Sequence, residues 1–358
     1  MFRYRSKALA SVAAAALIFA ACSDDDSSES ADTTAAPATT AAAPAETTAP
    51  GADLSALSGK TVGIVSLAPG LEPVDRIAAG VEACFTENGG SAQTFDAKGG
   101  TEAVQAFEQA NAAGVDAVYN VANDIGGGGL DAQLADAAAA GRPVITAWSG
   151  QRAGSYSITG LEFQSAARVG QYVIDRLAAQ NDGLAAGTVL IANARVTPSL
   201  RQRADAFKAM AGPNTEYPDI EVVEVEVDIA NAVADAQAKV EQALQANPDI
   251  DAVLASFDSI GQGAAAAVDA AGTGQFVVSF NGDSSALDLI RGGSSFVATA
   301  ANDLEGTATL ACELFAQLLS GGTPSATTYY MDSPLVTDKN VPASGFATGV
   351  GAFTLFQP

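Results

Sequence analysis

The stretch DIDAVLASFDSIGQGAAAAV, residues 249–268, contains the pattern that decides the fold. Its run AVLAS at 252–256, apolar up to the final serine, predicts a buried strand, because short apolar runs of this kind form the inner strands of sheets. A helix is predicted at residues 260–271, where small and apolar residues recur at helical spacing. A strand that leads through a short loop into a helix is the repeating unit of folds with parallel sheets.

The same strand–helix unit recurs on both sides of this stretch, from Lys60 onward. Further strands are predicted at residues 61–67, 92–96, 116–121, 142–147, 188–194, 220–228, 276–281, 296–300 and 327–331. Further helices are predicted at residues 74–88, from residue 101, and at 130–140, 166–179, 200–210, 232–246, 286–291 and 304–320. This alternation predicts an α/β fold with two doubly wound parallel sheets, in which ligands bind beyond the carboxyl ends of the strands.

The composition excludes several classes of function. The chain contains no histidine, which removes the serine and cysteine mechanisms that need an imidazole base and every histidine metal site. A net charge of -24 argues against a nucleic-acid partner, because phosphate contacts need clustered Lys and Arg. We therefore expect no catalytic residue and no metal or other cofactor. A glycosidase that uses a pair of carboxylates is the enzymatic alternative that composition leaves open.

An apolar run within LASVAAAALIFAACSDDDSSES, residues 9–30, follows a basic start and ends at Cys22. The run is too short to span a bilayer, which needs about 20 apolar residues, so it predicts a secretory signal at residues 1–21. The sequence FAAC at residues 19–22 resembles the lipobox of bacterial lipoproteins, in which cleavage leaves a lipidated cysteine at the new N-terminus. Lipidation of Cys22 implies an extracytoplasmic protein that the membrane holds through its lipid anchor only.

Residues 22–58 are expected to form a disordered acidic tether. Residues 23–53 are mostly Ser, Asp, Thr, Ala and Pro, and they include no aromatic residue that could help to form a core. About 300 residues follow, which is more than one compact core usually holds, so two lobes are expected. Two cysteines lie in this folded part, Cys84 and Cys312. In an exported protein they form either a disulfide or two separate buried thiols, and the residues alone leave both alternatives open.

In their order and spacing, several segments resemble the periplasmic sugar-binding proteins of the ribose-binding type, which share their fold with the effector domains of lactose-repressor-like regulators. Besides the opening stretch, these segments are KTVGIVSL (60–67), GVDAVYNV (114–121), GRPVITAWSG (141–150), SLRQRADAF (199–207), VVSFNGD (277–283) and SFVATAANDLEG (295–306). The resemblance implies two α/β lobes joined by three crossovers, the type I periplasmic binding protein fold. It places the N-terminal lobe at residues 59–158 plus 303–324 and the C-terminal lobe at residues 159–302 plus 325–358.

The same resemblance implies a function. A small carbohydrate-like ligand is trapped as the lobes close, and a monomeric binding protein delivers it to the permease of an ATP-driven (ABC) importer. A sensory or chemoreceptor role without transport is an alternative, because the same lobe surface could dock either partner. A repressor needs a DNA-binding segment ahead of this fold, where the chain has the lipobox and the tether.

The resemblance carries over three contact positions from the first half of the chain. Ser66 ends the first strand and resembles a hydroxyl that bonds a sugar OH, and Asn120 matches a polar contact position. Trp148 stands where many members have an aspartate, and its ring could stack on the apolar face of a sugar. The alternative for Ser66 and Asn120 is that their side chains form hydrogen bonds with nearby backbone groups. The alternative for Trp148 is that it is a core aromatic residue.

Four further positions come from the second half. Arg203 matches an arginine that donates paired hydrogen bonds to ligand oxygens, and its alternative role is a surface ion pair. Phe257 replaces a frequent asparagine and could be a core aromatic. Asn281 replaces the usual aspartate, and Asn302 matches an amide beside the hinge, or else bonds nearby backbone.

The replacement of two family carboxylates by Trp148 and Asn281, with Arg203 kept, suggests a ligand with fewer paired hydroxyls than ribose or glucose. A guanidinium without a compensating partner is costly in a closing cleft unless a ligand oxygen meets it. The expected ligand is therefore a deoxysugar, a polyol or a sugar acid whose carboxylate pairs with Arg203. The family topology also places the first and last helices on one sheet face, which implies a Cys84–Cys312 disulfide.

Overall fold

The computed structural model describes residues 53–346. The predicted signal segment, the lipidation site Cys22 and the tether up to residue 52 lie outside the described residues. Within residues 53–346, no helix combines the length and the apolar character that crossing a bilayer requires.

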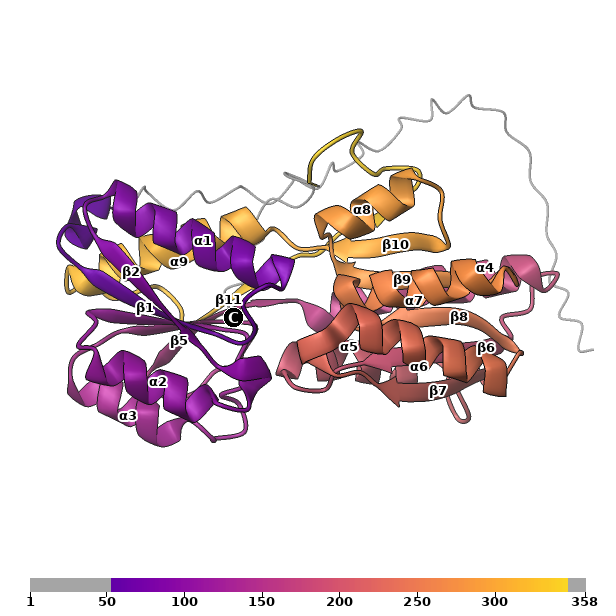
Figure 1. Ribbon diagram of the computed structural model, residues 1–358, viewed down its shortest axis with the longest axis horizontal. Helices are drawn as coiled ribbons and strands as arrows, with labels where there is room; N and C mark the ends of the chain where they lie inside the picture. The colour runs from indigo at the N-terminus through magenta and orange to yellow at the C-terminus, as the bar shows by residue number, and fades with distance from the viewer. Residues whose placement is uncertain (1–52, 347–358) are drawn as a thin grey trace, which may run out of the picture. The chain divides into compact units, whose positions relative to one another are not determined.

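The N-terminal lobe is built on a parallel six-stranded sheet with the order β11-β5-β4-β3-β1-β2 (Figure 1). Its strands are β1 (Thr61–Ser66), β2 (Ser91–Asp96), β3 (Ala117–Val121), β4 (Val144–Ala147), β5 (Ser155–Gly160) and β11 (Thr328–Met331). Its helices are the 3-10 helices η1 (Leu54–Leu57) and η2 (Lys98–Gly100) and the α-helices α1 (Glu72–Glu87), α2 (Ala103–Ala112), α3 (Asp131–Ala139) and α9 (Leu304–Leu319). Helices α1 and α9 pack together on one face of the sheet, and α2 packs with α3 on the other (Figure 1).

The C-terminal lobe repeats this plan with the strand order β12-β10-β9-β8-β6-β7, in which only β12 runs antiparallel to its neighbour. Its strands are β6 (Gly187–Asn193), β7 (Ile220–Glu226), β8 (Ile250–Ala255), β9 (Phe276–Asn281), β10 (Phe296–Ala301) and β12 (Leu335–Thr337). Its helices are α4 (Glu162–Gln180), α5 (Pro198–Met210), the 3-10 helix η3 (Ile229–Asn231), α6 (Ala232–Ala246), α7 (Asp258–Ala271) and α8 (Ser284–Arg291). The inner strand β8 is buried except at Asp251, as the apolar run in the opening stretch predicts, and its neighbour β9 is wholly buried.

The chain passes between the lobes after β5, after β10 and after β11, so the predicted two-lobe fold with three crossovers is confirmed. The lobe limits differ from the expected ones in two places. Thr328–Met331 pairs with β5 in the N-terminal sheet, because the third crossover follows β11 rather than preceding it. Leu54–Leu57 forms a 3-10 helix with Leu57 fully buried near α9, so the folded part begins before the expected end of the tether.

Cys84 of α1 and Cys312 of α9 lie together where these two helices pack. Their Cα atoms are 6.4 Å apart and their sulfur atoms lie at bonding distance. The packing of α1 against α9 brings the pair together, as the family topology implies. Oxidation of the pair in the exported protein stays a prediction.

Candidate ligand-binding site

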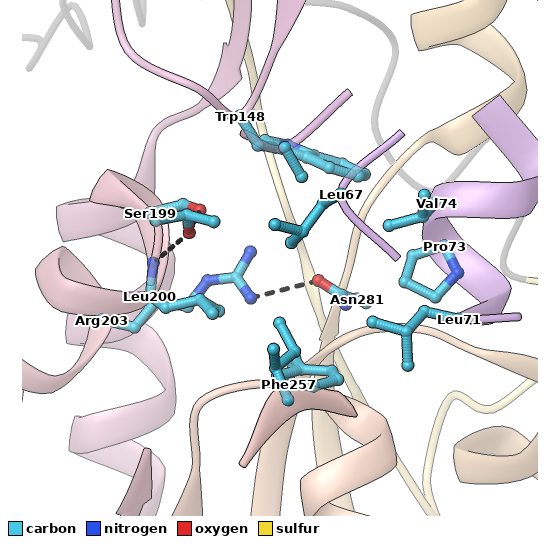
Figure 2. A pocket seen from close by; sticks show the side chains of 13 residues that line it. Leu67, Leu71, Pro73, Val74, Trp148, Ser199, Leu200, Arg203, Phe257 and Asn281 are labelled. Carbon is cyan, nitrogen blue, oxygen red and sulfur yellow. Dashed lines mark hydrogen bonds between the residues drawn. The ribbon is translucent and has the colours of Figure 1, made fainter. Parts of the chain in front are cut away.

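A small, mostly apolar cavity lies between the two lobes and has a volume of about 40 Å³. Both lobes contribute to its wall (Figure 2). The lining residues are Leu67, Leu71, Pro73, Val74, Ala122, Trp148, Thr197, Ser199, Leu200, Arg203, Ile229, Phe257 and Asn281.

The fold places these residues because the carboxyl ends of parallel strands meet at one edge of each sheet. In the N-terminal lobe, Leu67 follows β1, Ala122 follows β3 and Trp148 follows β4. In the C-terminal lobe, Phe257 follows β8 and Asn281 ends β9. The cavity therefore lies where the two strand-end edges face each other.

The first turn of α5 supplies the polar wall on the side of the C-terminal lobe. Thr197 is the N-cap of this helix, and its hydroxyl accepts a hydrogen bond from the Leu200 N–H at 3.3 Å. Pro198 occupies the first position of the helix, where its missing N–H costs nothing. This start points Ser199 and Arg203 toward the cavity (Figure 2).

Arg203 is the centre of the polar contacts and is almost fully buried, with 3 % of its side chain exposed. Its Nε donates to Glu162 Oε2 at 2.6 Å, and its Nη2 donates to Glu162 Oε1 at 3.3 Å. Its Nη1 donates to the Ser256 carbonyl oxygen at 2.9 Å and to Asn281 Oδ1 at 3.1 Å. Since a guanidinium has five N–H groups, one N–H on Nη2 has no acceptor among the described residues.

The expectation that Arg203 lacks a partner within the protein is wrong. Glu162, at the start of α4, is as deeply buried as Arg203 and forms a two-pronged ion pair with it. The positive charge is therefore compensated before any ligand enters. A second carboxylate, such as that of a sugar acid, would leave the group with an excess negative charge in a buried site, which is unfavourable.

Trp148 and Phe257 supply aromatic wall to the cavity, one from each lobe (Figure 2). Trp148 is 6 % exposed and has a left-handed backbone with φ 54°, which is a rare conformation for so large a residue. Its backbone N–H donates to the Ile158 carbonyl oxygen at 3.0 Å, so the pairing of β4 with β5 holds this conformation. The indole N–H is buried and has no hydrogen-bond partner among residues 53–346.

The other three candidate residues, Ser66, Asn120 and Asn302, lie outside the cavity lining. Ser66 is a buried residue at the end of β1. Asn120 turns away into a buried pair with Asn123, in which each amide donates to the other residue at 3.0 Å. Asn302 lies at the second crossover, where its Nδ2 donates to Asn281 Oδ1 at 3.1 Å and thereby orients a lining residue.

Sequence reasoning missed Glu162 and most of the apolar wall. Glu162 stands 41 positions from Arg203, and only its place at the first turn after a crossover could have indicated a role at the cleft. Leu71, Pro73 and Ile229 belong to loops and first turns, where an apolar residue gives no periodic signal.

The lobes also contact each other through residues outside the cavity lining. Arg201 of α5 donates to Asp124 of the N-terminal lobe, with Nη2 and Oδ2 2.6 Å apart. Glu72 at the start of α1 accepts from the backbone N–H of Ser284 at 2.7 Å and from its hydroxyl at 2.6 Å. These contacts join the two lobes outside the cavity lining.

Comparison with known proteins agrees with this architecture. The family model described as "Periplasmic binding protein domain" matches residues 72–323. An ABC sugar transporter subunit from Rhodobacter sphaeroides is 22% identical, with a TM-score of 0.69 over 79% of this chain and 100% of its own. An ABC transporter solute-binding protein from Agrobacterium vitis, which holds allitol, is also 22% identical, with a TM-score of 0.71 over 80% of this chain and 97% of its own.

A third similar structure is a 5-methylthioribose transporter solute-binding protein from Thermotoga lettingae, with its ligand bound. It is 22% identical and has a TM-score of 0.68 over 79% of this chain and 86% of its own. At this identity the likeness between the structures concerns the fold, while the family match covers most of the chain. The chain is therefore a member of the periplasmic binding protein family, with the type I fold of the sugar-binding proteins of ABC transporters.

Proposed function

We propose that this protein is the solute-binding lipoprotein of an ABC importer and that it captures a small, uncharged, sugar-like molecule by lobe closure. The ligand is a deoxysugar or a polyol, and a sugar acid is excluded. Cys22 carries the lipid anchor, and the protein acts as a monomer outside the cytoplasmic membrane, where it delivers the ligand to the permease.

The state of Arg203 is the observation that carries the choice of ligand. Its charge is satisfied by Glu162, and its remaining N–H is directed at an apolar cavity with Trp148 and Phe257 in its wall. A donor in such a place favours a neutral acceptor oxygen, since an unpaired buried donor costs about 1–3 kcal/mol. The ring faces favour a ligand with apolar C–H surface.

Two of the similar structures contain ligands of this chemistry. The Agrobacterium vitis protein holds allitol, a polyol, and the Thermotoga lettingae protein holds 5-methylthioribose, a deoxygenated sugar with an apolar substituent. A hydrolytic role has less support, because a glycosidase needs two carboxylates that flank the bond to be cleaved. The cavity lining includes no Asp or Glu among the described residues.

The test uses Trp148, the one tryptophan of the chain, as a reporter inside the site. Intrinsic fluorescence and thermal unfolding are measured with polyols such as allitol, with deoxysugars and 5-alkylthio sugars, with neutral hexoses and with sugar acids. We expect at least one polyol or deoxysugar to change the emission and raise the Tm, and the sugar acids to do neither. A response to sugar acids alone, or to neutral hexoses alone, contradicts the proposed ligand class.

A variant pair separates binding in this cavity from binding elsewhere. Phe257→Ala removes one aromatic ring from the cavity and should weaken the response at least tenfold. Phe163→Ala removes an exposed ring that is absent from the lining and should leave the response unchanged. The anchor is tested separately: Cys22→Ser should move the mature protein from the membrane fraction to the soluble fraction, and retention in the membrane would contradict lipidation.

A further inference from the structure

The N-terminus of α8 is capped by a residue from the other lobe. Asp283 holds the N-cap position, yet its side chain accepts no hydrogen bond from the helix, although Asp is a preferred N-cap. The carboxylate of Glu72 instead accepts from the Ser284 N–H at 2.7 Å and from the Ser284 hydroxyl at 2.6 Å. A carboxylate at this place also gains from the helix dipole.

The carboxylate of Asp283, which makes no cap bond to its own helix, has no partner among the described residues. The residue is 1 % exposed, and neither carboxylate oxygen has a hydrogen-bond partner among residues 53–346. Its backbone N–H donates to Asp258 Oδ2 at 2.7 Å, so a second buried carboxylate lies next to it. A buried carboxylate in this position is unfavourable while it carries a charge.

From these contacts we propose that lobe closure exchanges the carboxylate that caps α8, with Asp283 as the cap in the open form and Glu72 in the closed form. The inference rests on the proposed function, because it requires lobes that open and close. Opening withdraws Glu72 with the N-terminal lobe and frees the helix end. Asp283 is already in the N-cap position, where a change of side-chain rotamer brings its oxygen to the free N–H groups.

The exchange couples closure to the uptake of a proton by Asp283. Burial, together with the charges of Asp258 and Glu72, raises the pKa of Asp283 well above its usual value, while Arg76 and Arg203 act in the opposite direction. In the open form Asp283 is an exposed helix cap, and its pKa is not raised in this way. The closed form therefore holds a proton at pH values at which the open form has released it, so closure weakens as pH rises between the pKa of Asp283 in the open form and its higher pKa in the closed form, by up to about tenfold per pH unit.

Asp258 also has a raised pKa, but it is not part of the exchange. Its carboxylate is held inside the C-terminal lobe, where Oδ1 accepts from the Thr299 hydroxyl at 2.8 Å. These partners belong to one lobe and move together with it. A cavity of about 500 Å³ that includes Glu72, Asp283 and Ser285 in its lining gives water a path to the exchanging pair.

The experiment compares ligand-free mature protein at pH 5 and pH 8. Small-angle scattering reports compaction, and amide hydrogen exchange at Ser284, corrected for the intrinsic rate, reports the bond to Glu72. The variants are Asp283→Asn, which keeps a good N-cap without a titrating group, and Glu72→Ala, which removes the cap of the closed form. The matched controls are Asp288→Asn on α8 and Glu82→Ala on α1, which change exposed carboxylates of the same helices.

We expect the wild type and both controls to be more compact, and Ser284 to be better protected, at pH 5 than at pH 8. The Asp283→Asn variant should be compact at both pH 5 and pH 8, and the Glu72→Ala variant should be open at both. The proposal is overturned if Asp283→Asn follows the pH response of the wild type, if the wild type has no pH response, or if Glu72→Ala leaves Ser284 protected. This experiment uses no ligand. If every sugar failed to bind, the proposed function would be contradicted, but the test of the cap exchange would not be affected.

Discussion

Replacing Glu162 with Gln should both destabilise the protein and change which ligands it accepts. The substitution keeps the volume of the side chain and removes one charge from an ion pair whose side chains are 3 % and 2 % exposed. Breaking a buried pair by neutralising one partner typically costs about 3–5 kcal/mol, because the other charge is left uncompensated. An amide oxygen can still accept from Arg203 Nε, so we expect the lower end of this range, about 3 kcal/mol.

Urea unfolding followed by circular dichroism measures the decrease in the free energy of unfolding. For a chain of this size, about 3 kcal/mol corresponds to a fall in Tm of roughly 6–12 °C. Glu224→Gln is the matched control, because Glu224 forms ion pairs with Arg195 and Lys208 at the protein surface. Glu224→Gln should lower the free energy of unfolding by less than about 1 kcal/mol. A loss of less than about 1 kcal/mol in Glu162→Gln would refute the claim that this pair compensates a buried charge.

The same variant tests the ligand argument. With Glu162 neutral, Arg203 offers an uncompensated charge to the cavity, so a sugar acid should now change the fluorescence of Trp148 although it has no effect on the wild type. The double variant Glu162→Gln with Arg203→Met removes both charges. It should be more stable than the single variant, and it should lose the gained response to sugar acids. A double variant that is less stable than Glu162→Gln would show that the other hydrogen bonds of Arg203 outweigh the charge.

Three further predictions concern stability. Without reductant, mass spectrometry should find Cys84 and Cys312 oxidised, and replacing both with Ser should cost on the order of 4 kcal/mol in urea unfolding; two free thiols would contradict the disulfide. Burial raises the pKa of Asp258 from 3.8 to about 7, so the folded form holds a proton that the unfolded form releases across this range, and stability should fall as pH rises through it. Asp258→Asn should flatten that slope in urea unfolding at pH 4.5 and 7.5, whereas an unchanged slope would exclude Asp258 as its source. A Cβ at Gly80 would lie 2.5 Å from the Cβ of Ala308, so Gly80→Leu should lower the Tm by forcing α1 from α9, and an unchanged Tm would show that the helices separate freely.

Much of the fold could be predicted because its signals are local. Apolar runs and helical spacing fall within single elements, and the predicted helix at 232–246 coincides with α6. The short strands β5 and β12 were not predicted. β12 has three residues and is held at the sheet edge by its antiparallel pairing with β10, a partner that no local pattern reveals.

The candidate site was harder to predict because its chemistry depends on pairs that are distant in sequence. The family pattern indicates which strand ends face the cleft, and Trp148, Arg203, Phe257 and Asn281 do line it. The family pattern does not reveal which hydrogen-bond partners each side chain has within the protein. Glu162, 41 positions away in the sequence, compensates the charge of Arg203, and no local pattern reveals this pairing.

Taken together, these contacts favour oxygen position over hydroxyl count as the basis of selectivity. Within the part of the chain that the structure describes, the unpartnered groups of the lining residues are donors, the Trp148 indole N–H and one N–H of Arg203, while the Asn281 Oδ1 already accepts from Arg203 and Asn302. A ligand without a correctly placed acceptor leaves these donors unpaired, at about 1–3 kcal/mol for each. The apolar wall discriminates more weakly: one methylene in such a pocket changes binding by about 10–200-fold, whereas a site built to hydrogen-bond a ligand group rejects the analogue without that group by about 10⁴–10⁵-fold. Because the Trp148 indole N–H is buried and has no hydrogen-bond partner among residues 53–346, two sugars with the same number of hydroxyls should differ in affinity when only one of them places an acceptor oxygen within hydrogen-bonding distance of this N–H.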